Sequence, residues 1–531
     1  MGYKVKELEE ANSKDKMSSF IDQLRIFASN NRNDESLLDT IEKAILKCHT
    51  IEDKKSLVKL YELKISQIEH LRENLPTVSE LIQQMKNISE EINYFGGLAL
   101  AYYKEWYVHK YTGNKGSSIK AINTSLDYVS QLSDSEEYVR HVCNYSYAVE
   151  IWLSKHDMKS SSIFENCAAY FYKNHFYRSF SQCLSYLFVI YQQAQDNEKL
   201  LNLIKKILMN TSFLNHISMD IQAIIYYYIG TSFKLSFNLN EAEKYLLEAN
   251  NLLKTVYHKS IYSNSFLTSL SHLTAIYALQ GKLELAYNKM KEVNKLLALE
   301  ETTKNLDSFS RGQIRHTFNL TEFYIRSRLE SNQKEELEKL TLTIVECLEK
   351  YHSNTIFLSE FLINANLTKN QFLLIKKINN PSTKRVEHII DFLIEKESCV
   401  EEKQLLNRIS ILKRRPVEER MTLVERAFAD LLAAQEYFKL ERYAEIYPLL
   451  RKYEKQLHGI EVLELHIFME AFIQIGAFKN GDPMGPALQY VAIKNCRYYG
   501  FTKLENKLLD YLSVQKNDVL KDMAIFQPNI S

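Results

Sequence analysis

The sequence contains very little glycine and proline. Its 531 residues include 13 Gly and 7 Pro, whereas average usage would give roughly 37 and 27 in a chain of this length. Proline is absent between Pro76 and Pro381, and glycine is absent between Gly116 and Gly230. Tight turns and strand corners depend on these residues, so the shortage disfavours all-β and most α/β architectures. Such long stretches without helix breakers predict an all-α protein.

The chain also lacks an excess of charge, closely spaced cysteines and long apolar runs. It has 67 Lys and Arg against 66 Asp and Glu, so no global charge attracts it to nucleic acid or anionic lipid. Its seven cysteines are widely spaced without a C-x-x-C pair, which indicates reduced thiols in the core. No secretory signal begins the sequence, and no apolar run approaches the ~20 residues that span a bilayer. We expect a cytoplasmic protein without a membrane or nucleic-acid partner.

Helical periodicity is clear between residues 19 and 75. Apolar residues recur there every three or four positions, which predicts three helices with breaks at 30–34 and 49–53. With 45% hydrophobic residues, the chain has enough apolar matter for a large core. The pattern is carried by Phe20, Leu24 and Phe27, then by Leu37, Ile41 and Ile45, and then by Leu57, Leu60, Leu63, Ile65 and Ile68.

Paired helices with short polar breaks follow, and successive pairs can be aligned with one another. The second helices of three pairs align at spacings of 42 and 44 residues, on Leu200, Ala242 and Ala286. Nine residues earlier, each pair has an aromatic residue, at Tyr191, Phe233 and Tyr277. A fixed period of this size indicates a helical repeat protein.

The best copy, residues 223–256, resembles the tetratricopeptide repeat. It has the residue types and spacing of that family at Tyr226, Ile229, Gly230, Phe233, Ala242, Leu246 and Ala249. The copy at 267–300 has Thr274 in the small-residue slot, and a weaker copy at 427–460 has Pro448 inside its second helix. The resemblance implies a right-handed α-solenoid, in which Gly230 lets the two helices of its pair approach closely. A generic helical bundle is the alternative.

The composition and the repeat pattern predict four regions. They are an N-terminal helical segment at 1–90, the tetratricopeptide-like array at 91–380, a linker region at 381–420 and a C-terminal tetratricopeptide-like block at 421–531. The linker is predicted from Pro381 and from the run Lys413-Arg414-Arg415-Pro416. Since Glu418 and Glu419 follow this basic run, we interpret it as a solvated segment and not as a nucleic-acid patch.

The resemblance also implies which side chains line the concave groove and contact a partner. They are Gln182, Ser185 and Gln192 in one copy, Tyr227, Thr231 and Lys234 in the next, and Thr268, Ser271 and Ala275 in the third. This mixture of small, polar and aromatic side chains suits an extended or helical peptide. The family's clamp for chaperone tails has Lys and Asn at the fifth and ninth slots. Because these slots hold other residues here, that partner is disfavoured.

No motif in the sequence carries recognisable chemistry. The segment 113–117 contains two glycines and a lysine but lacks the order of a phosphate-binding loop. Glu349 and His352 form an E-x-x-H pattern, whereas a di-iron bundle needs two. His141 and Cys143 would lie on different faces of a helix. We therefore predict no catalytic residue, no cofactor and no metal, with a Cys–His pair assembled in space as the alternative.

Two functional hypotheses follow from this sequence. The first is a non-enzymatic scaffold that holds a peptide or partner protein in the concave groove of the superhelix, and a homo-oligomer is compatible with it. The second is a regulator that senses a ligand or peptide and passes the change to an effector or to transcription. An enzyme would require a polar pocket or cofactor site, for which the sequence gives no sign.

Overall fold

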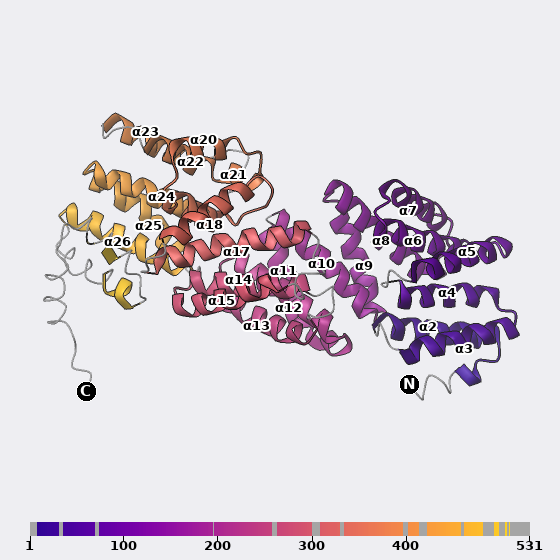
Figure 1. Ribbon diagram of the computed structural model, residues 1–531. Coiled ribbons are helices and arrows are strands. Elements are labelled where there is room, and N and C mark those ends of the chain that lie inside the picture. Colours follow the sequence, from indigo (N-terminus) through magenta and orange to yellow (C-terminus); the bar gives the residue numbers. More distant parts are fainter. Residues whose placement is uncertain are drawn as a thin grey trace, which may run out of the picture. The chain divides into compact units, whose positions relative to one another are not determined.

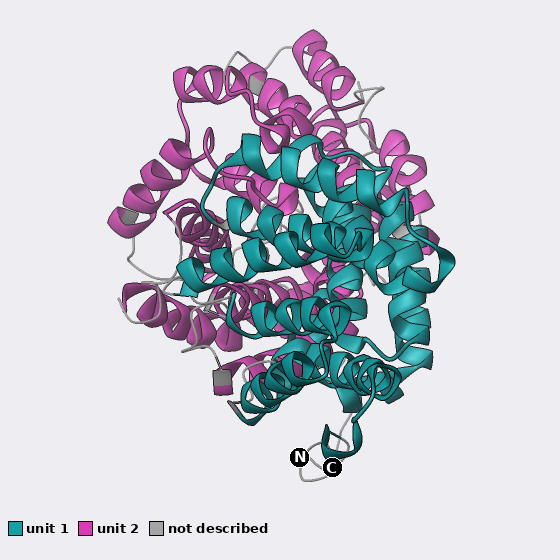
Figure 2. Cartoon of the chain, turned by 90° about the vertical axis from the view of Figure 1, so that its right-hand side faces the viewer, with its two compact units in different colours: residues 1–228 teal, residues 229–531 magenta. Residues whose placement is uncertain are grey.

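The structure is a computed structural model and consists of packed helices (Figure 1). It describes residues 8–30, 35–69, 74–194, 196–256, 263–299, 308–329, 334–396, 402–413, 422–457, 461–481, 493–498, 505, 506 and 509. No β-strand occurs within these ranges, so the prediction of an all-α fold is confirmed. The chain forms two compact units, residues 1–228 and 229–531, and the division falls inside helix α12 (Met219–Leu235) (Figure 2).

Unit 1 is a series of helices in which most pack on the next and several also pack on the next but one. This contact pattern is typical of helical repeats. The helices are α2 (Lys14–Asn30), α3 (Glu35–Thr50), α4 (Lys54–Ile68), α5 (Leu75–Glu91), α6 (Phe95–Tyr111), α7 (Lys115–Val129), α8 (Glu137–Lys155), α9 (Ser160–Lys173), α10 (Tyr177–Gln193) and α11 (Asn197–Met209), with short 3₁₀ turns at Asp134–Glu136 and Thr211–His216.

Unit 2 has the same pattern: α14 contacts α15 and α17, and α24 contacts α25 and α26. Besides the end of α12, its helices are α13 (Leu239–Val256), α14 (Ser263–Leu279), α15 (Leu283–Ala298), α17 (Ser308–Arg328), α18 (Lys334–Cys347), α19 (Thr355–Asn364), α20 (Lys369–Lys376), α21 (Pro381–Arg385), α22 (Glu387–Lys396), α23 (Glu402–Lys413), α24 (Leu423–Lys439), α25 (Tyr443–Gln456) and α26 (Leu463–Lys479).

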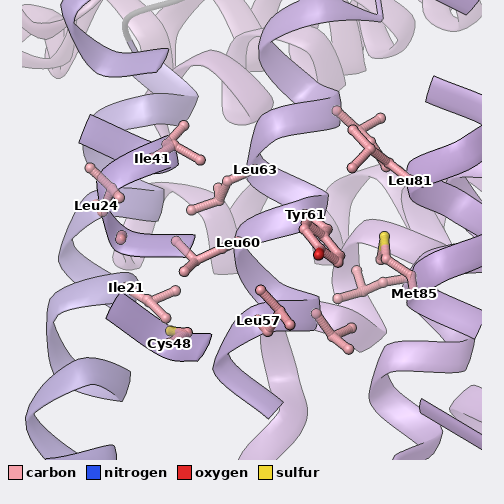
Figure 3. Close-up of a cluster of buried hydrophobic side chains, with 14 of the residues drawn as sticks. Ile21, Leu24, Ile41, Cys48, Leu57, Leu60, Tyr61, Leu63, Leu81 and Met85 are labelled. Atoms are coloured by element: carbon pink, nitrogen blue, oxygen red, sulfur yellow. The ribbon is translucent and has the colours of Figure 1, made fainter. Parts of the chain in front are cut away.

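The three helices predicted for residues 19–75 are present as α2, α3 and α4. Helix α4 lies in the middle, and its apolar side chains point to both sides (Figure 3). Leu60 faces Ile21 of α2 and Ile41 of α3, whereas Tyr61 faces Met85 of α5. All five side chains are buried, as the apolar spacing of the sequence predicts.

Side-chain caps set where several helices begin. Asp53 precedes α4 and accepts a hydrogen bond from the Ser56 backbone N–H at 3.1 Å. Thr422 and Glu425 form a capping box at the start of α24, because each side chain accepts from the other's backbone N–H. Such caps supply partners for backbone groups that have none inside the helix.

The same turn joins the two helices of pair after pair. In it, an N–H after the first helix donates to a carbonyl five residues earlier, as in a Schellman motif, and the residue before this N–H has positive φ at Phe237, Gly281 and Glu441. The aligned aromatic residues provide these carbonyls: Tyr191 accepts from Asp196, Phe233 from Asn238 and Tyr277 from Lys282, at 3.0, 3.0 and 2.9 Å. Tyr437 accepts from Arg442 at 3.0 Å in the weaker copy. The spacings of 42 and 44 residues therefore mark equivalent positions in space.

Gly230 lies where the two helices of the best copy come closest. A Cβ atom added to Gly230 would stand 2.6 Å from Cγ of Leu246 and 3.0 Å from the Leu246 backbone nitrogen. No side chain fits this space, which confirms the predicted role of Gly230. Gly281 has φ +75° and occupies the turn between the two helices of the next copy.

Unit 1 is closed by contacts between its beginning and its end. The side-chain amide of Asn30, at the end of α2, donates to the His175 carbonyl at 2.9 Å and accepts from the Arg178 N–H at 3.2 Å. These partners are 145 and 148 positions apart in the sequence. The interior of the unit holds a fully buried lysine, Lys104, whose ammonium lies 3.0 Å from the Glu69 carboxylate.

In unit 2, too, hydrogen bonds join two segments that are far apart in the sequence. The backbone N–H of Glu461 donates to the Phe237 carbonyl at 3.0 Å, and the Glu461 carboxylate accepts from the Asn240 N–H at 2.6 Å. The Asn240 side-chain amide donates to the same carboxylate. The segment before α26 thus returns to the turn between α12 and α13, 221 residues earlier. The helices of unit 2 therefore enclose an interior.

The unit boundary and the helices differ from the predicted regions. Residues 8–69 share one buried cluster with side chains of α6 and α8 such as Ala99 and Cys143, so no structural division falls at residue 90. The predicted linker contains α21, α22 and α23 between 381 and 413, because Pro381 occupies the first turn of a helix capped by Asn380. The rest of the basic run at 413–416, and most of the chain after 481, lies outside the described residues.

We expect the substitution Gly230→Ala to destabilise the protein. Overpacking costs about 1–3 kcal/mol and the better helix propensity of alanine returns up to about 1 kcal/mol, so the free energy of unfolding should fall by about 1–2 kcal/mol. Urea unfolding followed by far-UV circular dichroism measures this change. Gly116→Ala is the matched control, because no atom lies within 4 Å of the added Cβ. Equal effects of both substitutions would contradict the close approach at Gly230.

We expect Glu441→Gly to stabilise the protein. Glu441 has φ +57° in the turn between α24 and α25 and its side chain is exposed. A left-handed backbone is strained for glutamate and unstrained for glycine, so the free energy of unfolding should rise by about 0.5–1 kcal/mol. The control Glu445→Gly lies in the first turn of α25 and should lower it by a similar amount. Chemical denaturation of both variants tests the prediction, and a loss of stability in Glu441→Gly would refute it.

Candidate functional site

A cavity lies inside unit 2. It has a volume of about 630 Å³, within the range of ligand-binding pockets. Its walls come from α14, α17, α18, α19, α20, α24 and α26 and from the segment 365–367. The cavity therefore joins helices from the first and last parts of unit 2.

Most of the cavity wall is apolar. Aromatic and branched side chains from four helices face it, and several of them are partly exposed, which leaves ring and methyl surface open to an occupant. Representative residues are Phe323, Ile356, Ile363, Phe428, Leu431 and Phe468.

One side of the cavity is polar and centres on Arg328 at the end of α17. Its Nε and Nη2 atoms donate to Oε2 and Oε1 of Glu464 on α26, at 2.6 and 3.0 Å. Nη2 also donates to Oε2 of Glu360 on α19 at 2.5 Å. The bidentate geometry is the strong form of an arginine–carboxylate pair. One guanidinium therefore joins three helices, two of them 136 residues apart.

Tyr324 and Asn364 complete this polar wall. The guanidinium carbon of Arg328 lies 3.5 Å from the centroid of the Tyr324 ring, and the Tyr324 hydroxyl donates to Glu464 at 2.6 Å. Asn364 donates from its side-chain amide to Glu360 at 3.1 Å. We call the set of Tyr324, Arg328, Glu360 and Glu464 the arginine cluster.

Charge in the arginine cluster is fixed by its contacts. Burial alone would lower the pKa of Arg328, but the carboxylate of Glu464, together with Tyr324 and Glu360, outweighs burial and holds that pKa well above its ordinary value. Burial raises the pKa of Tyr324 well above its ordinary value, and Glu464 adds to this effect while Arg328 opposes it. Arg328 is therefore a cation and Tyr324 a neutral phenol over the physiological pH range. With ionised carboxylates, the cluster carries one excess negative charge.

A third carboxylate stands at the edge of the cavity. Glu338 on α18 is exposed, as is Leu342 one turn later, and both line the cavity. The described lining residues thus contain three carboxylates and one guanidinium, while the other polar ones are uncharged amides and hydroxyls.

The residues predicted to line a partner groove in unit 2 are mostly buried. Exposure is 8% for Thr231 and Lys234, 4% for Ser271 and 3% for Ala275, while Thr268 is partly exposed. Little of these four side chains is open to a partner. Gln182, Ser185, Gln192 and Tyr227 belong to unit 1 and are partly exposed.

Two helices of the predicted groove in unit 2 do meet through a polar contact. The Lys234 ammonium on α12 lies 2.9 Å from Nδ1 of His272 on α14. Burial lowers the pKa of Lys234 to about 8. Burial and the neighbouring Lys234 hold the pKa of His272 well below its ordinary value, so a neutral imidazole faces the ammonium.

The same α14 face reaches the cavity at its C-terminal end. Thr268, His272, Ala275 and Leu279 follow each other at helical spacing, and Leu279 lines the cavity. The arginine cluster was not predicted from the sequence. The charged residues themselves are visible in the sequence, such as Arg328 in the last turn of α17 and Glu360 in the otherwise apolar α19, but no pattern shows that they pair.

A Cys–His pair does occur in a cavity of unit 1, but its geometry does not activate the thiol. Cys167 donates from Sγ to the backbone carbonyl of His141 at 3.4 Å, and the His141 ring stacks on Tyr170 at 4.1 Å. Burial raises the pKa of Cys167 to about 12 and lowers that of His141. A thiol in this state is not a nucleophile.

Two further properties concern the described residues as a whole. They contain no group of three or more His, Cys, Asp and Glu side chains placed to hold a metal ion. No helix among them combines the length and the apolar character needed to cross a membrane.

Comparison with known proteins does not assign the chain to a family. No family matches its sequence, and no curated protein is significantly similar to it.

We expect Arg328→Met to destabilise unit 2 strongly. The substitution leaves two partly buried carboxylates without their shared cation, which costs about 3–5 kcal/mol in comparable buried pairs. Far-UV circular dichroism in urea measures the loss. Both tryptophans, Trp106 and Trp152, lie in unit 1, so their fluorescence should keep its wild-type transition.

The matched control for this prediction is Arg311→Met. Arg311 is exposed on the same helix and lines no described cavity, so its substitution should change the free energy of unfolding by less than about 0.5 kcal/mol. If Arg328→Met behaved like Arg311→Met, Arg328 would not be needed to close the unit.

Proposed function

We propose that this chain is a non-enzymatic interaction protein whose unit 2 binds a peptide segment of a partner in its interior cavity. The observation that carries the proposal is the cavity itself. It is built from the inward faces of successive helices, and its largely apolar wall is interrupted by one polar cluster. Apolar side chains with a few placed polar groups are the usual composition of a recognition site.

The helical architecture also supports a binding role. Stacked helix pairs expose a continuous inner surface with contributions from many repeats, and such surfaces hold peptides and proteins. We further propose that the repeats are of the tetratricopeptide type, wound in a right-handed superhelix. This proposal rests on the equivalent turns at Tyr191, Phe233, Tyr277 and Tyr437 and on the close approach at Gly230.

A photo-crosslinking amino acid in the cavity tests the proposed function. Phe428 lines the cavity and is partly exposed, so p-benzoylphenylalanine is incorporated at this position. Irradiation of the cells that express the variant should crosslink it to a polypeptide. Mass spectrometry of the digested adduct identifies the partner and the attached position.

The control position for crosslinking is Phe309. It is 50% exposed on α17 in the same unit and lines no described cavity. The proposal requires a polypeptide that is captured from Phe428 and not from Phe309. The same adducts from both positions, or none from Phe428, would refute binding in the cavity.

The sensor-regulator is the second candidate, and the closure of unit 2 favours it. Helices α14 and α17 form one side of the cavity and α26 another, so an occupant contacts both ends of the unit. Occupancy would then alter the contact of Glu461 with Phe237 and Asn240. An adduct with the mass of a short peptide or a small ligand, in place of a partner protein, would support this candidate.

A further inference from the structure

We propose that the cavity of unit 2 selects a peptide segment that carries a lysine or arginine side chain next to apolar residues. This inference rests on the proposed function and specifies the chemistry of the occupant. The basic side chain would lie along the carboxylates of Glu338 and Glu360, and its apolar neighbours would contact the rings and methyl groups of the opposite wall.

The charge balance of the cavity is the first argument. Its described lining residues include Glu338, Glu360 and Glu464 but only one cation, Arg328. The described lining residues therefore carry more negative than positive formal charge. Because the surrounding wall is largely apolar, these charges are screened less than charges on an open surface. A basic side chain is complementary to this field, whereas an acidic one is repelled.

The depth of the carboxylates is the second argument. Glu338 is exposed at the edge, whereas the side chain of Glu360 is 15% exposed and that of Glu464 is 12% exposed. Negative charge thus extends from the edge to the interior of the cavity. A long, flexible side chain with a cationic end can follow this path and bury its methylene groups on the apolar wall.

The partners of Arg328 give the third argument. Glu464 accepts both of its bidentate hydrogen bonds and Glu360 accepts a further one. An anionic group on the occupant would have to displace a carboxylate from this guanidinium. A cationic group needs no such exchange, because it adds to a site that already has excess negative charge.

Apolar surface at the edge explains why a peptide suits the cavity better than a free amine. Leu342 lines the cavity beside Glu338 on α18 and is 56% exposed. Apolar side chains on both sides of the basic residue would cover this surface. A small polyamine would leave it in contact with water.

A positional-scanning hexapeptide library is the test of this inference. The full chain is immobilised and incubated with mixtures in which one position holds a single defined residue and the other positions are random apolar residues. We expect mixtures with Lys or Arg to be retained about tenfold more than mixtures with Asp or Glu, because one favourable ion pair in a partly buried site has this effect. A spermidine competition arm tests whether a free amine alone displaces the retained peptides, and the inference predicts that it does not.

Three variants locate the effect. Glu338→Gln changes an exposed side chain and Glu360→Gln leaves the bidentate pair of Arg328 and Glu464 in place, so both should fold. Each should reduce the preference for Lys and Arg at least threefold, while apolar peptides remain bound. Glu346→Gln is the matched control, because Glu346 is exposed on α18 and lines no described cavity. It should keep the wild-type preference.

The outcomes separate this inference from the proposed function. Retention of apolar mixtures without any preference for Lys or Arg would refute the inference and leave peptide binding intact. A preference that survives both Glu338→Gln and Glu360→Gln, or displacement by spermidine, would also refute it. If no mixture is retained by the wild-type chain, the proposed peptide-binding function fails as well.

Discussion

The interior of unit 2 depends on one guanidinium. Arg328 lies at the end of α17 and holds Glu360 of α19 and Glu464 of α26, so that helices far apart in the sequence become neighbours. The contact lies where α17, α19 and α26 meet at the cavity, which α14 and α24 also line. At this point, an ion pair holds the helices of unit 2 together around the cavity. The contact is not a continuation of the packing between successive repeats.

A polar closure has a definite physical effect. Buried ion pairs lose much of their Coulomb energy to desolvation and contribute little net stability, but they tolerate few alternative arrangements. Apolar faces of helical repeats can slide past one another at small cost, whereas a bidentate pair requires one register. The hydrogen bonds of Glu461 to Phe237 and Asn240 set a second fixed point, three residues before Glu464 in the chain. Unit 1 uses the same principle, with Asn30 holding His175 and Arg178.

A feature could be predicted from the sequence when the residues that form it lie close together in the sequence. Gly230 and Leu246 lie within one helix pair, so a repeat alignment could predict their close approach. The Schellman turns were harder to see, because Glu441 stands in a left-handed position where Gly281 stands in another copy. This tolerance of other residues explains how a chain so poor in glycine makes many equivalent turns. The arginine cluster could not be predicted, since nothing in a periodic pattern tells which turn of a solenoid meets another 136 residues away.

The buried groove residues also show what a repeat pattern cannot predict, namely the exposure of a side chain in the folded unit. In an open superhelix, the positions of Thr231, Lys234, Ser271 and Ala275 would face a groove, but in the closed unit 2 their side chains have little exposure. The repeat pattern predicted that these positions lie on an exposed groove, whereas in the structure they are buried. The cavity begins where α14 ends at Leu279. There, the guanidinium of Arg328 is already held by two carboxylates. For the proposed peptide site, the chemistry available to an occupant is therefore the negative charge in excess of this guanidinium.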